Sequence, residues 1–570
     1  MNKSIQTPRQ RFLEEPIRKS NANPLVIFET GIPMRDGVEL AADVYLPANK
    51  FLPAPAIIQS TPYDKSNPIF FLNEARFFQE HGYVVIVHDV RGRGKSEGYW
   101  RAFVNDGPDT HDVIEWAAHQ NWCTGKIGTT GLSYMGWTQW AAAFEKPPHL
   151  TCMISTSAAG RWQQEIPYTS GVFQLYFGWW VYLVRRRITE LHGLEEHDWE
   201  TILRTLPLAS IGDFMSPVGE TWSDMLDHDT LDEHWKSLRF DERYGEIDVP
   251  CLHVTGWYDM EDLAGAFHHY ENMIKASPGA KDQKLIVGPW SHINCRWPHS
   301  SYGGIEFGSS AAIDMDETHL RWFNYWLKNE QNGVPGDPPV KIFEPGKNSW
   351  LSTDHWPLSN GESSFFLRFN GTEGSLSTVP PLTEDPAQSY RYNPVDPAPT
   401  QVDIKKYPVE DIPLDQTPVE SRPDVILYTS EPLSKETVIS GWPYLEIFAS
   451  SDCEDTEWHV KITDVYPDGR SIKVTQGCLR ASYRDSLEIP SPLIPDHIYA
   501  FNIELWPTHH VFLPDHRLRI TVTSSDFPWF ARSMNCFGKI ANLATPNIAI
   551  NTVFHAPVYP SCLKLPVNRA

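Results

Sequence analysis

Short apolar runs alternate with amphipathic stretches over the first 157 residues. The apolar runs predict buried strands at 54–58, 83–88 and 150–155. Between them, segments with apolar residues on one side predict helices over 69–81 and 109–120. Strands that alternate with helices are typical of a mostly parallel sheet, so residues 1–157 are expected to form the first half of an α/β core.

The pattern then becomes helical, aromatic and charged. Residues 158–245 contain no run with strand periodicity and are expected to form a helical cap over the core. The helices expected there cover 173–187, 195–206 and 230–240. Apolar strand runs return over 246–347, which predicts the second half of the same core.

The pattern of apolar and polar residues changes again after residue 347. Residues 348–570 contain many short alternating strands separated by Pro and Gly turns, for example 444–448 and 458–462. This pattern predicts an all-β jelly roll or sandwich. The expected fold class is therefore α/β with an additional C-terminal β domain.

A Gly-x-Ser-x-x-Gly motif places Ser133 between Gly131 and Gly136. It lies between a strand expected at 126–130 and a helix expected over 134–144. This is close to a nucleophile elbow, the sharp strand-to-helix turn that lifts a serine hydroxyl clear of an α/β sheet. Glycine–serine turns also occur in ordinary loops, so the motif alone leaves a structural turn as the alternative.

Two later strands end at a candidate acid and a candidate base. The run 249–256 leads to Asp259, and the run 284–288 leads to His292. Catalytic groups of open α/β sheets lie at the carboxyl ends of strands, and the chain order Ser, Asp, His is the one expected. Individually, Asp259 is also compatible with a helix N-cap and His292 with a loop histidine. Together they predict a triad in which His292 takes the Ser133 proton and Asp259 orients His292.

Ester or amide hydrolysis also needs donors for the developing oxyanion. The backbone N–H of Tyr134, directly after the nucleophile, is one candidate. The hydroxyl of Tyr63, in the loop that follows the strand at 54–58, is the second.

Charge and composition narrow the function classes. The 570-residue chain has 48 Lys and Arg against 72 Asp and Glu, a formal net charge of −24. Such a balance argues against nucleic acid and anionic membranes as partners. It favours a soluble protein, with steering of cationic substrates as a weaker interpretation. The expected partner is a small ester or amide, and a homo-oligomer is left open.

The sequence lacks the motifs that would indicate secretion, a membrane span or a metal site. Residues 1–23 are polar and lack the apolar core of a signal peptide, and no apolar run is long enough to span a membrane. The eight scattered cysteines fit a reduced, cytoplasmic protein. His268 and His269 are poor co-ligands because adjacent helical residues point to different sides. We therefore expect no metal and no organic cofactor.

As a set, several motifs resemble the cocaine-esterase and X-prolyl dipeptidyl-peptidase-like serine hydrolases, a family that includes α-amino acid ester hydrolases. These motifs are at 34–38, 62–65, 89–98, 131–136, 256–259, 288–292, 464–470 and 511–517. The resemblance implies an α/β-hydrolase core, a helical cap inserted after the elbow and a C-terminal jelly roll. It also implies a triad at Ser133, Asp259 and His292, with Tyr63 in the oxyanion hole.

Two acidic residues that follow Asp259 in the sequence bear on which acyl group the protein accepts. In cocaine-esterase-like members these positions are apolar, whereas in α-amino acid ester hydrolases they are Glu-Asp and hold the substrate ammonium. This chain has Glu261 and Asp262 there, with Glu165 as candidate third carboxylate and Trp257 as a further candidate for substrate binding. The alternative is that the two acids only favour a helix N-terminus, an effect of about 0.3–1 kcal/mol.

The sequence thus predicts a serine hydrolase that forms an acyl-enzyme and prefers small acyl groups with an α-amine. A cocaine-esterase-like carboxylesterase for neutral aryl or alkyl esters is the main alternative, since residues 292–294 look closer to that branch. An X-prolyl dipeptidyl-peptidase is less favoured because those members carry an extra N-terminal domain. A non-catalytic binding protein that uses the jelly roll is the remaining alternative.

Overall fold

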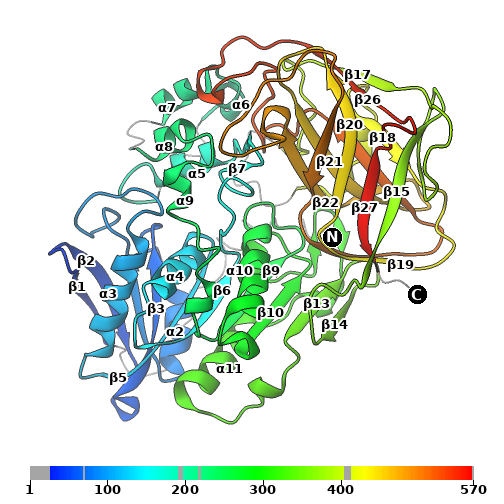
Figure 1. Ribbon diagram of the computed structural model, residues 1–570. Coiled ribbons are helices and arrows are strands. Elements are labelled where there is room, and N and C mark those ends of the chain that lie inside the picture. The colour runs from blue at the N-terminus through cyan, green and yellow to red at the C-terminus, as the bar shows by residue number, and fades with distance from the viewer. Residues whose placement is uncertain (1–25, 68–70, 190–196, 216–219, 403–411, 568–570) are drawn as a thin grey trace, which may run out of the picture.

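The computed structural model describes residues 26–67, 71–189, 197–215, 220–402 and 412–567. Figure 1 shows a sheet flanked by helices (blue to green), a group of short helices beyond one end of it, and a β-rich part in yellow to red. One hydrophobic cluster runs through all three parts and includes Trp137, Trp222 and Trp506. Residues 1–23, where no signal peptide is expected, lie outside the described residues.

The first part is built on a ten-stranded sheet in the order β1-β2-β4-β3-β5-β6-β9-β10-β13-β14. Its strands are β1 Val26–Pro33, β2 Glu39–Leu46, β3 Ala54–Thr61, β4 Val84–Asp89, β5 Cys123–Leu132, β6 Leu150–Thr156, β9 Cys251–Gly256, β10 Gln283–Gly288, β13 Val340–Glu344 and β14 Ser349–Thr353. The pairs from β4 to β13 are parallel, and those at both edges are antiparallel. β3 and β4 are buried along their whole length, as parallel strands covered on both faces are.

Helices pack against both faces of this sheet, which confirms the α/β core. They are α2 Asn73–Glu80, α3 Asp106–Ala118, α4 Tyr134–Phe144, α10 Leu263–Ala276 and α11 Met315–Lys328. The helix predicted over 134–144 has those bounds, whereas the one predicted over 69–81 is described only from residue 71 and begins at Asn73. β14 still pairs with β13, so this sheet continues to Thr353, beyond the boundary expected at residue 347.

The segment 158–245 forms short helices rather than the long ones predicted. They are α5 Phe177–Val184, α6 Trp199–Leu203, α7 Ile211–Phe214, α8 Thr221–Asp227 and α9 Glu233–Lys236. A small hairpin, β7 Tyr168–Thr169 and β8 Val172–Phe173, precedes α5, although no strand is predicted there. Two-residue strands are too short to produce a periodicity. The turn between them is made by Ser170 and Gly171, with φ of 50° and 85°.

The C-terminal part is a β domain, as predicted. Its strands are β15 Gly361–Phe369, β16 Gly374–Ser377, β17 Gln388–Tyr392, β18 Ile426–Thr429, β19 Thr437–Gly441, β20 Tyr444–Ser451, β21 Glu457–Val465, β22 Ser471–Arg480, β23 Tyr499–Glu504, β24 Thr508–Phe512, β25 Arg517–Thr523, β26 Ala549–Val553 and β27 Cys562–Val567. All of these pair in one mostly antiparallel sheet system. β21 and β22 form a hairpin around the predicted turn at 467–469.

β22 joins the β domain to the rest of the molecule. It is buried along its whole length because Ile472 and Cys478 belong to the cluster shared with the core, while Val474 and Leu479 belong to the cluster inside the β domain. A strand covered on both faces holds its neighbours in a fixed position.

Within the described ranges no helix is long and apolar enough to cross a membrane.

Candidate active site

Ser133 lies at the junction of β5, which ends at Leu132, and α4, which begins at Tyr134. Its backbone has φ 64° and ψ −127°, a strained conformation for a non-glycine residue and the one that a nucleophile elbow requires. A Cβ on Gly131 would lie 2.4 Å from Cβ of Met135, and one on Gly136 would lie 2.8 Å from Cβ of Ala158. Both glycines are therefore needed for the strand and the helix to approach this closely.

Asp259 and His292 meet because they follow the adjacent parallel strands β9 and β10. His292 Nδ1 lies 3.1 Å from both Oδ1 and Oδ2 of Asp259. Asp259 Oδ1 also accepts the backbone N–H groups of Glu261 and Asp262, at 2.9 and 3.2 Å. Burial alone raises the pKa of Asp259, but the charge of His292 and these hydrogen bonds hold it below its ordinary value. An ionised Asp259 keeps the proton of His292 on Nδ1 and leaves Nε2 to act as the base.

The hydroxyl of Tyr63 lies next to Ser133, the predicted nucleophile. A hydrogen bond joins it to the Ser133 side chain, and it accepts the indole N–H of Trp180 at 3.1 Å. Burial raises the pKa of Tyr63 far above its ordinary value, so the phenol stays protonated. Because Trp180 in α5 occupies a lone pair of this oxygen, the Tyr63 proton is available to an oxyanion that develops beside Ser133.

The backbone N–H of Tyr134, the second predicted oxyanion donor, belongs to the first residue of α4, where helix amides have no acceptor within the helix. Its side chain is fixed separately. The hydroxyl donates to Asp106 Oδ2 at 2.8 Å and accepts the N–H of Phe103 at 2.9 Å. Burial raises the pKa of Asp106 to about 7.

The loop that carries Tyr63 is supported on both sides. Arg93 Nε donates to the carbonyl of Pro62 at 2.7 Å, and Asp89 Oδ1 accepts the N–H of Lys65 at 2.7 Å. Arg93 also donates to the carbonyl of Val184 at 2.5 Å, at the end of α5. The Tyr63 loop is therefore tied to both the core and the cap.

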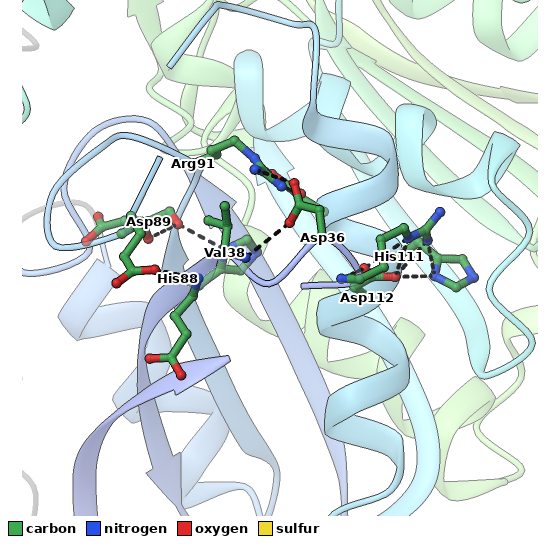
Figure 2. A network of polar contacts seen from close by, with 12 residues as sticks. Asp36, Val38, His88, Asp89, Arg91, His111 and Asp112 are labelled. Atoms are coloured by element: carbon green, nitrogen blue, oxygen red, sulfur yellow. Dashed lines mark hydrogen bonds and ion pairs between the residues drawn. The ribbon is translucent and has the colours of Figure 1, made fainter. Parts of the chain in front are cut away.

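Figure 2 shows how the segment around Asp89 is itself held. Arg91 forms an ion pair with Asp36 at 2.7 Å and another with Asp109 of α3 at 2.6 Å. On the neighbouring turn of α3, Asp112 accepts from Arg35 at 2.7 Å. The Arg91–Asp36 ion pair thus joins two of the sequence motifs, 34–38 and 89–98, and each motif is also held to α3 by an ion pair.

Glu261 lies against the imidazole of His292. Its Oε2 is 3.6 Å from His292 Nε2, and its carboxylate is hydrogen-bonded to Tyr176 of the cap. Burial raises the pKa of Glu261 to about 7, against the opposing effect of the positive His292. Within the described part of the chain, Oδ1 of the buried Asp262 has no hydrogen-bond partner. Burial and the neighbouring carboxylates raise the pKa of Asp262 well above its ordinary value.

These carboxylates change the titration of His292. Burial by itself lowers the pKa of the imidazole, but the charges of Glu261 and Asp259, the hydrogen bond that His292 donates to Asp259 and the charge of Asp262 together raise it to about 10. A general base must be neutral to accept a proton. A positive group brought into this cluster would lower the pKa of His292 and favour the neutral imidazole.

The other predicted residues have different surroundings. Glu165 is fully buried, and its two oxygens accept backbone N–H groups of Gly265 and Gly160, at 2.5 and 3.4 Å. Burial raises its pKa to about 8. Its contacts join the cap entry to the first turn of α10, and its charge acts on Asp259 and Asp262, so Glu165 borders the same carboxylate cluster. Trp257 donates to the carbonyl of Phe343 at 2.7 Å and stacks on Phe267, so it packs between core elements.

The histidine pair on α10 has separate partners. His268 Nε2 lies 2.8 Å from Asp241, whereas His269 contacts the Tyr244 hydroxyl and the Ala159 carbonyl. Glu271 instead accepts two indole N–H groups, from Trp356 and Trp442. These three side chains do not converge on one point.

Three side chains at the site were not found from the sequence. Trp180 and Tyr176 reach Tyr63 and Glu261 from the cap, and Ser157 is hydrogen-bonded to Asp259. The two cap residues lie in a segment rich in aromatic residues, where periodicity does not distinguish a pocket from packing. Ser157 follows β6, the strand between β5 and β9 in the sheet, which is the only sequence-level signal of its position.

Sequence comparison assigns both large parts of the chain. Residues 36–294 match the X-Pro dipeptidyl-peptidase (S15) family, and residues 332–564 match the X-Pro dipeptidyl-peptidase C-terminal non-catalytic domain. The cocaine esterase of Rhodococcus sp. (strain MB1 Bresler) is 31% identical, over 94% of this chain and 97% of the relative.

Two solved structures are similar over nearly the whole chain. An α-amino acid ester hydrolase has 27% identity and a TM-score of 0.85, with 99% of this chain and 100% of that one covered. An aminopeptidase from a marine-sediment Thaumarchaeota archaeon has 24% identity and a TM-score of 0.85, with 97% and 98% covered. At that identity the aminopeptidase supports the fold alone.

Proposed function

Since the chain belongs to the X-Pro dipeptidyl-peptidase (S15) family and is a serine hydrolase, we propose that it cleaves carboxylic esters or amides whose acyl group carries an α-amine. Ser133 is the proposed nucleophile, His292 the general base and Asp259 the residue that orients His292. The proposed oxyanion donors are the Tyr63 hydroxyl and the Tyr134 N–H. No step of this reaction requires a metal or an organic cofactor.

The proposed reaction has two halves. His292 Nε2 takes the proton of Ser133 as Oγ attacks the acyl carbonyl, and the tetrahedral oxyanion accepts hydrogen bonds from Tyr63 and Tyr134. Imidazolium then protonates the leaving alcohol or amine, and the acyl-enzyme remains. Water, activated by the same His292, attacks the acyl-enzyme and releases the acid.

The observation that carries the amine preference is the pair of buried carboxylates beside the base. Glu261 Oε2 lies 3.6 Å from His292 Nε2, so its carboxylate borders the place where an acyl group bound to Ser133 would be. Asp262 is the N-cap residue of α10 but makes no side-chain cap hydrogen bond. This weakens the interpretation of these acids as helix-end charges. An ammonium donor would satisfy both carboxylates in one step.

A neutral-ester function is the second candidate. It is favoured by the 31% identity to the cocaine esterase over 94% of this chain. For a neutral substrate the acidic cluster is a disadvantage, because it keeps His292 protonated in the neutral pH range. The two functions therefore differ in a measurable pH dependence as well as in substrate preference.

The deciding experiment compares kcat/KM for the methyl esters of phenylglycine and phenylacetic acid, which differ only by the α-amine. A paired buried charge contributes about 2 kcal/mol or more, so we expect roughly 30-fold or greater preference for phenylglycine. Equal rates, or a preference for phenylacetate, would support the neutral-ester function instead.

Glu261→Gln is expected to change the two esters in opposite directions. The phenylglycine ester should lose roughly 30-fold in kcat/KM because its ammonium loses a charged partner. The phenylacetate ester should gain at pH 7, since removing a negative charge lowers the pKa of His292 and a larger fraction of the base is neutral. The pH–rate profile for phenylacetate should shift its rising limb to lower pH. Glu306→Gln, an exposed glutamate in the hairpin strand Ile305–Glu306, is the matched control.

If both esters lost activity equally in Glu261→Gln, the carboxylate would have only a structural role. If neither changed, Glu261 would have no place in acyl recognition or in the titration of His292.

Tyr63→Phe is expected to lower kcat by roughly 10²- to 10³-fold with little change in KM, because it removes one oxyanion donor and keeps the ring. Steady-state kinetics with the preferred ester measure both parameters. Tyr45→Phe, at another buried tyrosine in β2, should stay within a few-fold of the parent. A loss of less than about threefold in Tyr63→Phe would remove Tyr63 from the oxyanion hole.

A further inference from the structure

A group of side chains that can bind metal lies at the C-terminal end of α3, opposite the end that contacts Tyr134. Glu115 is in the last turn of α3, His119 is its C-cap residue, and His149 precedes β6. One ligand atom from each of the three lies within 4.8 Å of the others. Glu115 and His119 are four residues apart and therefore share one side of the helix end.

Hydrogen bonds set the tautomer of both histidines. His119 Nδ1 lies 2.7 Å from the carbonyl oxygen of Glu115, which can only accept, so the proton is on Nδ1 and the lone pair on Nε2. His149 Nδ1 lies 2.8 Å from Glu115 Oε2, and the backbone N–H of His149 donates to Oε1 at 3.2 Å. His119 therefore presents Nε2 as a ligand atom. His149 faces the carboxylate itself with Nδ1, so an ion would replace the proton between Nδ1 and Glu115 Oε2, and the remaining imidazole proton of His149 would be on Nε2.

We propose that Glu115, His119 and His149 form a binding site for a divalent transition metal of the zinc type. Two imidazole nitrogens and one carboxylate are the donor set that Zn²⁺ takes in sites that keep a water as the fourth ligand. Ligand atoms of a tetrahedral zinc site are roughly 3.3 Å apart, so modest side-chain rotations would close the present separation. Ca²⁺ and Mg²⁺ prefer oxygen ligands and should not bind here.

The site is accessible and has a defined structural consequence. The side chains of Glu115 and His149 are 21% and 35% exposed, and His119 is exposed, so an ion can enter from solvent. A bound ion would join the C-terminal end of α3 to the start of β6. The first residue of α3 is Asp106, which holds the Tyr134 hydroxyl, so the ion would stabilise the helix behind the proposed oxyanion hole.

The test uses the full-length chain after treatment with a chelator. Zn²⁺ is titrated in by isothermal calorimetry, and the unfolding temperature is followed with and without the ion. We expect one site that is lost, or at least tenfold weaker, in His119→Ala and His149→Ala, together with loss of the zinc-induced rise in Tm. His355→Ala, at an exposed histidine elsewhere, should bind as the parent does, and Mg²⁺ should give no heat.

His292 and its carboxylates are a second place where Zn²⁺ could bind, and inhibition of hydrolysis would report it. His119→Ala distinguishes the two sites. In this variant Zn²⁺ should inhibit ester hydrolysis to the same degree as in the parent, but it should no longer raise the Tm. His119 is exposed, and among the described residues its ring makes one hydrogen bond, to its own helix, beside an edge contact with His149, so this variant should fold. Unchanged zinc stoichiometry and Tm shift in both histidine variants, or no zinc binding by the parent, would overturn the proposal.

Discussion

Replacing Ser133 with alanine is expected to lower kcat/KM for every substrate by roughly 10⁴-fold or more, and to abolish formation of an acyl-enzyme. The serine is at φ 64° in a turn where the strand and the helix come too close for a Cβ on Gly131 or Gly136. Alanine fits the same backbone, so the loss should be chemical rather than structural. The measurements are steady-state kinetics and the mass of the protein after reaction with a serine-reactive phosphonate.

Ser291→Ala is a suitable control for this variant. Ser291 is buried and directly precedes His292, and its hydroxyl has no hydrogen-bond partner among the described residues. Its removal should leave kcat/KM and phosphonate labelling unchanged. Activity in Ser133→Ala within tenfold of the parent would exclude Ser133 as nucleophile and, with it, both proposed ester functions.

Asp259→Asn is expected to lower kcat by roughly 10⁴-fold without unfolding the protein. An asparagine oxygen can still accept the backbone N–H groups of Glu261 and Asp262, which Asp259 Oδ1 accepts now. Its amide group would then donate toward His292 Nδ1 and force the proton onto Nε2. That tautomer cannot accept the Ser133 proton. Kinetics and the thermal unfolding transition together separate this effect from a loss of structure.

Asp262→Asn is the matched comparison because it replaces another buried carboxyl of the same loop by the same amide. With the neutral phenylacetate ester, this variant should keep kcat within a few-fold, or raise it at pH 7 by lowering the pKa of His292. Equal losses in Asp259→Asn and Asp262→Asn with this ester would mean that the loop geometry, rather than the Asp259–His292 pair, limits catalysis.

Much of the architecture followed from local patterns. Apolar runs such as 54–58 predict β3, because a parallel strand covered on both faces must be apolar along its whole length. The helix over 134–144 was bounded by the elbow on one side and a loss of apolar periodicity on the other. The β domain followed from short alternating strands. By contrast, the hairpin β7–β8 and the short cap helices left no periodic signal, because elements of two to eight residues do not complete enough turns or alternations.

The predicted site residues also fall into two groups, according to whether a local pattern indicates their position. Ser133, Asp259 and His292 are predicted from the strands that precede them, and parallel strands carry such residues to one edge of the sheet. Glu165 is the candidate that the family resemblance implies at the cap entry, and Trp257 lies in the strand-end motif that carries Asp259. The structure assigns Glu165 contacts with the N–H groups of Gly160 and Gly265, and assigns Trp257 a position in the packing between elements.

The sequence by itself determined the reaction class, the order of the domains and the carriers of the proposed triad, because all three depend on short-range spacing. Only the tertiary structure decided what surrounds those groups. It brings Trp180 onto Tyr63, puts Glu261 Oε2 3.6 Å from His292 Nε2, and joins His149 to the end of α3. Such contacts link segments separated by tens of residues or more. They depend on how the elements pack, and local periodicity contains no record of that packing.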